Sequence, residues 1–205
     1  MKIGVLAVQG AFIEHENKLR ALGAECVELR KKEDILQNRL DGLVLPGGES
    51  TVQGKLLKEL NMFDSIKEMI EKGIPVLATC AGMILLAQQL SGDSTVHFGT
   101  LPVTVKRNAY GRQLGSFKTR SQFKGIGNVE MVFIRAPYVE KVNDNEVEVL
   151  AEVDGKIAGV SYKNQIALAF HPEIGEEDYI HQLFLNKISY NKTGALLHFS
   201  DSNVI

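Results

Sequence analysis

The sequence predicts a single α/β domain built on a largely parallel β-sheet. In the first ninety residues, short apolar runs alternate with amphipathic segments. Parallel strands require crossover connections of this kind, and they are apolar along their whole length because helices cover both faces of the sheet. The chain of 205 residues is 44% hydrophobic and has no linker-like stretch, so one domain with a substantial core is expected.

The expected strands of this first half cover residues 2–8, 24–30, 42–48 and 74–80. The expected helices between and after them cover residues 13–23, 56–73 and 81–90.

The second half predicts more strands and a mixed sheet. After residues 97–105, strand-like runs cover residues 129–137, 147–155 and 165–173, with turn-like sequences between them. An amphipathic run over 176–189 predicts a last helix, and the tail that follows has weak periodicity. We therefore place the domain at residues 1–189 and a loosely held C-terminal tail at 190–205.

Composition excludes several classes of function. A net charge of −2 with 23% charged residues is unlike a disordered or nucleic-acid-coating protein. No window approaches the roughly 18 consecutive apolar residues of a membrane helix, and the N-terminus has no signal-peptide cleavage site. Two cysteines do not make a disulfide framework, so we expect free thiols in the cytoplasm. No cluster has metal-ligand spacing, and no cofactor motif is present.

Cys80 stands where an expected strand meets an expected helix, in the sequence "ATCAG". Small neighbours, Ala78, Ala81 and Gly82, permit the sharp turn that lifts a nucleophile above a sheet edge. The unpaired N–H groups of a helix start also favour a thiolate. The alternative is a small buried side chain without chemistry. Cys26 has no such turn around it, and we interpret it in that second way.

A nucleophilic cysteine needs a base, and His171 is the best candidate. Of the five histidines, it alone ends an apolar strand-like run and has a carboxylate two positions on, Glu173. Residues two apart in an extended segment point to the same side, so Glu173 can orient the ring. The other four are interpreted as surface or core residues: His15, His97, His181 and His198.

The run "LVLPGGES" takes a third strand into a glycine pair, Gly47 and Gly48. Their backbone N–H groups are candidates for an oxyanion hole, and a plain tight turn is the alternative. A phosphate-binding loop is excluded because five residues separate Gly48 from Gly54, and Leu56 stands where Ser or Thr is required.

In that chain order, "PGGES", "TCAG" and "FHPE" resemble the class I (triad) glutamine amidotransferases. With "VQGAF.EH", "RNAYGRQLGSF" and "VFIRAP", the chain is similar from Lys2 to about Ile188 to the PdxT family, the glutaminase subunits of pyridoxal 5'-phosphate synthase. The resemblance implies a flavodoxin-like three-layer α/β/α sandwich with a largely parallel central sheet. It also implies hydrolysis of L-glutamine to glutamate and ammonia, without a cofactor.

The resemblance implies a role for each site residue. Cys80 is the nucleophile, His171 the acid and base, and Glu173 the group that fixes the His171 tautomer. The implied oxyanion donors are the N–H groups of Gly47 and Gly48 with one after Cys80. Glu49 suits the ammonium of glutamine and an arginine suits its carboxylate. The implied contacts to glutamine are Gly47, Gly48, Glu49, Arg107, Ile134 and Arg135.

The same resemblance implies a partner, a (β/α)₈-barrel synthase subunit of the PdxS type that receives the ammonia in a large hetero-oligomer. We hypothesise that the "PGGES" peptide changes orientation when that partner binds, because glycine peptides rotate at little steric cost. Three alternatives remain open at this point. The chain serves another synthase such as imidazole glycerol phosphate synthase, or it is a non-catalytic amidotransferase-like binding module, or it is a related hydrolase or peptidase.

Overall fold

The computed structural model describes residues 1–107 and 115–193, and its central feature is a five-stranded parallel sheet. The strands are β1 (Lys2–Leu6), β2 (Glu25–Leu29), β3 (Gly42–Leu45), β4 (Val76–Thr79) and β12 (Gln165–Leu168). Their order is β2-β1-β3-β4-β12, and every neighbouring pair is parallel. Strands β3, β4 and β12 are buried at every residue, as strands covered on both faces must be.

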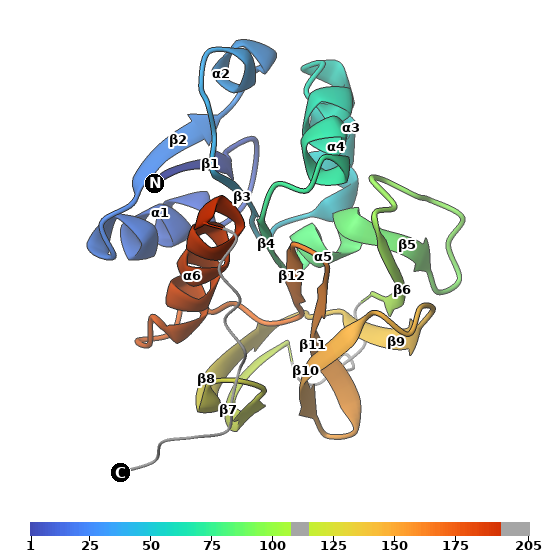
Figure 1. The fold of residues 1–205 in the computed structure, drawn as a ribbon. Helices are drawn as coiled ribbons and strands as arrows, with labels where there is room; N and C mark the ends of the chain where they lie inside the picture. Colours follow the sequence, from blue (N-terminus) through green and yellow to red (C-terminus); the bar gives the residue numbers. More distant parts are fainter. Residues whose placement is uncertain (108–114, 194–205) are drawn as a thin grey trace.

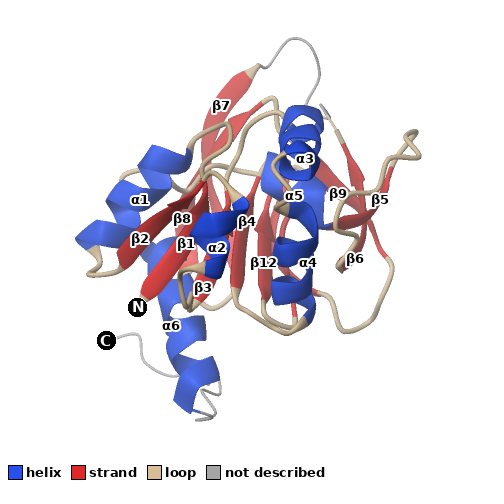
Figure 2. Cartoon of the chain, turned by 90° about the horizontal axis from the view of Figure 1, so that it is seen from above, coloured by secondary structure: helices blue, strands red, loops and turns tan. Residues whose placement is uncertain are grey.

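Six helices accompany the sheet in the described part of the chain. They are α1 (Phe12–Ala21), α2 (Lys32–Leu36), α3 (Ser50–Glu59), α4 (Phe63–Glu71), α5 (Ala81–Leu86) and α6 (Tyr179–Thr193). Figures 1 and 2 show α1 and α6 on one side of the parallel strands and α3, α4 and α5 on the other. This three-layer α/β arrangement confirms the predicted fold class. Within residues 1–107 and 115–193, no helix is long and apolar enough to cross a membrane.

The second half extends the sheet with antiparallel strands, as the sequence predicts. Strands β11 (Lys156–Tyr162), β10 (Glu148–Val153), β7 (Ser116–Phe123) and β8 (Gly127–Ile134) continue it from β12. A branch is formed by β9 (Tyr138–Val142), β6 (Leu101–Lys106) and β5 (Ala87–Leu90). Phe133 and Phe170 pack together with ring centroids 5.9 Å apart, so this extension is fixed against the segment that follows β12.

Two predicted helices differ from the structure. The helix expected over 56–73 is two helices, because Asn61 adopts a positive φ of 53° between α3 and α4. The helix expected over 81–90 ends at Leu86, where Ala87 turns to an extended conformation with ψ of 136°. Residues 87–90 pair with β6 instead, and this pairing satisfies the backbone groups that the helix leaves open.

Two sequence features reach beyond the described residues. Most of the "RNAYGRQ" run, residues 108–113, lies outside them, as does 194–205 of the predicted tail with His198. Helix α6 itself continues through Thr193.

The register of the parallel strands determines where the site forms. Ala78 is paired with Leu45 on one side and with Ala167 on the other. The chain therefore leaves β3, β4 and β12 at the same edge of the sheet, which is the usual place for sites in open α/β folds.

Candidate active site

Cys80 lies at the end of β4 in a strained backbone conformation, with φ 48° and ψ −101°. Its N–H donates to the carbonyl oxygen of Leu168 at 2.8 Å, which ties the turn to the end of β12. A methyl group on Gly82 would lie 2.0 Å from the carbonyl oxygen of Leu45, so only glycine fits there. The small residues of "ATCAG" thus form the sharp strand-to-helix turn that the sequence predicts, with a buried thiol at its apex.

His171 and Glu173 leave the neighbouring strand β12 and face each other. The ring Nδ1 of His171 lies 2.7 Å from Oε1 of Glu173, and both side chains are buried. The N–H of His171 donates to the carbonyl oxygen of Val132 at 2.8 Å, which fixes this segment on β8. Nε2 of His171 is buried without a hydrogen-bond partner among the described residues, so it is the ring nitrogen left for chemistry.

Gly47 brings the "PGGES" loop against both of these side chains. A methyl group on Gly47 would lie 2.3 Å from Cε1 of His171 and 3.4 Å from Cβ of Cys80. The three turns that follow β3, β4 and β12 therefore meet, and Gly47 is the point of closest approach. Any larger residue at this position would displace the His171 ring.

Both backbone groups of Gly47 are hydrogen-bonded within the protein. Its N–H donates to Oγ1 of Thr79 at 3.0 Å, and its carbonyl oxygen accepts from the N–H of Ala11 at 3.1 Å. Gly10 permits this approach, because a methyl group there would lie 1.9 Å from the Gly47 oxygen. The Gly47 N–H, which the sequence predicts as an oxyanion donor, is thus occupied by Thr79 in this arrangement.

The predicted glutamine contacts do not all lie beside Cys80, His171 and Glu173. Glu49 is exposed beside the glycine pair, and its N–H donates to Oε1 of Gln9 at 2.8 Å. Ile134 and Arg135 end β8, shortly after the Val132 carbonyl that binds His171.

Arg135 is exposed and has a positive φ of 42°, while its N–H donates to the carbonyl oxygen of Gly115 at 2.8 Å. Arg107 forms an ion pair with Asp93 rather than with a triad residue. Ile134 and Arg135 therefore follow closely on the Val132 carbonyl that binds His171, whereas Arg107 pairs with Asp93.

Three buried polar residues behind the triad were missed by sequence reasoning. Nε2 of His15 lies 3.3 Å from Oε2 of Glu173 and 3.1 Å from Oγ1 of Thr79. Nδ1 of His15 lies 3.0 Å from Nε2 of His181 on α6. Of the two interpretations, surface or core, the structure selects the core for His15 and His181, which are 0% exposed. The sequence signal that could have found His15 is its position in α1, shortly after β1 ends. This places it near the sheet edge at which β3, β4 and β12 also end.

The titration of the site is set by burial and by these neighbours. Burial lowers the pKa of His171, but Cys80 and then Glu173 outweigh it and raise the pKa to about 10. Burial raises the pKa of Glu173, but His15 and His171 lower it more, and the net shift is downward. Burial dominates at His15 and lowers its pKa. At neutral pH the site therefore holds an imidazolium at His171, a carboxylate at Glu173 and a neutral imidazole at His15.

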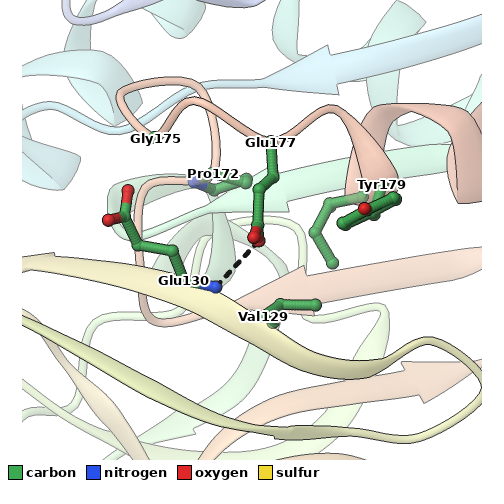
Figure 3. A pocket seen from close by; sticks show the side chains of 7 residues that line it. Val129, Glu130, Pro172, Gly175, Glu177 and Tyr179 are labelled. Atoms are coloured by element: carbon green, nitrogen blue, oxygen red, sulfur yellow. Dashed lines mark hydrogen bonds between the residues drawn. The ribbon is translucent and has the colours of Figure 1, made fainter.

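A small pocket on the other side of the triad segment shows how that segment is anchored (Figure 3). Glu177 accepts a hydrogen bond from the N–H of Glu130 at 2.9 Å and forms an ion pair with Arg120 at 2.8 Å. These contacts fasten the chain after Glu173 to β8. The pocket is lined by Val129, Glu130, Pro172, Gly175, Glu177, Tyr179 and Ile180. In the described ranges, no group of three or more His, Cys, Asp or Glu side chains is placed to hold a metal ion.

Comparison with known proteins agrees with this geometry. The model of the SNO glutamine amidotransferase family matches residues 5–190. A pyridoxal 5'-phosphate synthase subunit PdxT from Desulfitobacterium hafniense is 62% identical over 193 residues, which is 94% of this chain and 96% of that protein. A protein of the same name from Methanocorpusculum labreanum is 52% identical over 189 residues, 92% of this chain and 98% of its own length.

The fold comparison leads to the same family. A crystal structure of a glutamine amidotransferase superposes with a TM-score of 0.85 at 40% identity, covering 91% of this chain and 98% of its own. The family match spans the strands, the three turns and the residues that meet at the sheet edge. The chain belongs to the SNO glutamine amidotransferase family.

Proposed function

We propose that this chain is the glutaminase subunit of a pyridoxal 5'-phosphate synthase, and that it hydrolyses L-glutamine with Cys80, His171 and Glu173. The observation that carries the proposal is the convergence of a strained cysteine turn, a histidine–carboxylate pair 2.7 Å apart and a glycine backbone at one sheet edge. The PdxT names of the curated relatives support the pathway.

The proposed reaction uses each group in a stated protonation state. The Cys80 thiolate attacks the side-chain amide carbon of glutamine, and the C–N bond breaks as Nε2 of His171 gives its proton to the leaving ammonia. The neutral His171 then takes a proton from water, whose oxygen attacks the γ-glutamyl thioester. Glutamate leaves, and Cys80 is again a thiolate beside an imidazolium. The raised pKa of His171, about 10, supports its role as the proton donor of the first step.

Substrate recognition is proposed at the mouth of the same edge. Glu49 attracts the ammonium of glutamine, and Gly47, Gly48 and Ile134 line the site. Arg135 pairs with the α-carboxylate by a bidentate contact that lysine does not reproduce. Arg107 joins this set after it releases Asp93.

The oxyanion hole is proposed to form only after the "PGGES" loop rearranges. The observed hydrogen bond from Gly47 N–H to Thr79 supports this, because a donor held by Thr79 is not aimed at a substrate oxygen. We propose that binding of a barrel synthase subunit of the PdxS type changes the orientation of the Gly47–Gly48 peptide. The same peptide orientation in crystals of the free and the partnered chain would refute this step.

The test is glutamate release from L-glutamine by the purified chain, alone and with a PdxS-type barrel subunit, with Cys80→Ala as the control. Activity that requires the barrel and disappears in Cys80→Ala is expected. An imidazole glycerol phosphate synthase barrel serves as the matched wrong partner. Activation by that barrel, and not by the PdxS-type barrel, would refute the proposed pathway and leave the proposed glutaminase mechanism in place. If neither barrel activates the chain and Cys80 does not react with a glutamine-analogue alkylator, the chain is a binding module instead.

A further inference from the structure

The outer oxygen of Glu173 lies near a ring nitrogen of His15. Oε1 of Glu173 is held by His171 at 2.7 Å, whereas Oε2 meets no regular hydrogen-bond partner among the described residues. Nε2 of His15 lies 3.3 Å from that Oε2. The exposed fraction of Glu173 is 4% and that of His15 is 0%, so water does not readily replace this contact.

The contacts of the His15 ring decide which nitrogen carries its proton. A proton on Nδ1 would be donated to His181, 3.0 Å away, and Nε2 would then accept from the Thr79 hydroxyl while Oε2 of Glu173 kept no donor from His15. A proton on Nε2 instead points to the region of Oε2 and the Thr79 hydroxyl, while Nδ1 accepts from Nε2–H of His181. A buried carboxylate oxygen without a donor is the costlier arrangement, so the Nε2–H tautomer is favoured.

We propose that His15 is a positioning residue of the triad, which donates its Nε2 proton to the outer oxygen of Glu173 and so holds that carboxylate ionised and aimed at His171. The carboxylate then has a donor on each oxygen. One comes from the base that it orients, and the other comes from a helix on a different part of the chain. His181 fixes the His15 ring from behind.

The groups that act on this cluster come from several elements of the fold. Glu173 is acted on by His15, by His171 and by its own backbone N–H, and His15 in turn by Glu173, His171 and Glu14. His181 is acted on by His15 and Lys18. Loss of the His15 donor is therefore expected to raise the pKa of Glu173, because the carboxylate would lose one of the groups that favour its ionised form.

The first test reads the tautomer in the unaltered protein. Two-bond ¹H–¹⁵N spectra of the ¹⁵N-histidine-labelled chain distinguish a proton on Nε2 from one on Nδ1. Neutral His15 with its proton on Nε2 is the expected result. A proton on Nδ1 would overturn the proposal, and this measurement does not depend on any variant folding.

The second test follows the rate of Cys80 alkylation by iodoacetamide from pH 4 to 8, read by mass spectrometry of the Cys80 peptide. In His15→Phe the acidic limb of the rate is expected to move up by about one pH unit, which is about a fivefold loss at the midpoint of the wild-type limb. His15→Gln keeps an N–H donor and is expected to move the limb back toward that of the wild type. His97→Phe is the matched control, because His97 is a partly buried histidine on the α3 side of the sheet, and its limb stays in place.

If His15→Phe folds and the acidic limb of its Cys80 alkylation rate does not move, His15 has only a packing role and the proposal is wrong. The inference rests on the proposed catalytic role of Cys80, His171 and Glu173, but neither test requires glutamine or a partner. A chain without glutaminase activity can therefore still confirm or refute the His15 contact, and the two failures are distinguishable.

Discussion

The two cysteines of the chain are almost equally buried, yet only one is placed for chemistry. Cys26 is 8% exposed in the middle of β2, and Cys80 is 7% exposed just beyond β4. Burial raises the pKa of Cys26 to about 11. Cys80 instead occupies a strained turn beside an imidazolium. Burial alone therefore does not distinguish an inert thiol from a nucleophile, whereas the position relative to the strand end does.

The largest difference between the two cysteines is expected when each is replaced by alanine. Cys80→Ala is expected to lower glutaminase kcat by about 10⁴-fold or more, because the covalent route is lost. Cys26→Ala is expected to retain kcat and to lower the free energy of unfolding by about 1 kcal/mol. Steady-state kinetics with the activating barrel and urea denaturation provide the two measurements. Equal losses of activity in both variants would mean that Cys80 has no special role.

Crowding around Cys80 gives the next largest effect. Gly47→Ala places a methyl group 2.3 Å from the His171 ring, so we expect kcat to fall about 10²-fold while the chain remains folded. Gly115→Ala is the control, because a methyl group at Gly115 meets no described residue within 4 Å. The same activity in both variants would show that the loop moves away from His171 freely.

Selective alkylation sharpens the comparison without any substrate. A thiol with a pKa of about 11 is a thiolate in about one molecule in 10⁴ at pH 7, so Cys26 should react slowly with iodoacetamide. Early labelling is expected on the Cys80 peptide, at least about 10²-fold faster than on the Cys26 peptide. Peptide mass spectrometry measures both rates in one sample. Comparable labelling would contradict the assignment of the nucleophile.

The smallest predicted effect is the pH dependence of stability. His171 has a raised pKa of about 10, so its contribution is complete below its unfolded value of 6.5 and is lost as pH rises toward 10. The free energy of unfolding that His171 contributes therefore decreases as the pH rises through that range.

His15 and His181 have lowered pKa values, so their contribution is present above 6.5 and is lost as the pH falls below it. Each therefore decreases the free energy of unfolding as the pH falls below 6.5, because the unfolded chain takes up a proton that the folded chain does not. Urea denaturation at pH 5.5, 6.5 and 8 should therefore give the highest stability near pH 6.5. His181→Phe should weaken the acidic slope, and a flat profile would contradict both assignments.

The parallel half of the fold and the triad were predictable because both depend on local patterns. Cys80 and the His171–Glu173 pair each stand at the end of an apolar run, and parallel strands bring such ends together. The contacts of His15 were not predictable in this way. They join residues separated by 64 and 166 positions along the chain, and only the tertiary packing of α1 against α6 brings them together.

Local patterns also failed where tertiary pairing overrode helix propensity. Residues 87–90 continue an apolar, helix-like run, but their backbone pairs with β6. The hydrogen bond between Gly47 N–H and Thr79 was also not predictable from local patterns. It depends on the register of β3 against β4, which places the ends of these two strands side by side.

The backbone conformation of Cys80 affects whether the cysteine is retained when such proteins evolve. Its positive φ of 48° is a conformation that side chains with a Cβ adopt at a cost of about 1–3 kcal/mol and that glycine tolerates. An inactive copy with Cys80→Gly is therefore expected to be more stable than the enzyme. Selection for stability alone would erase the nucleophile, so the cysteine persists in a lineage only while ammonia production is under selection.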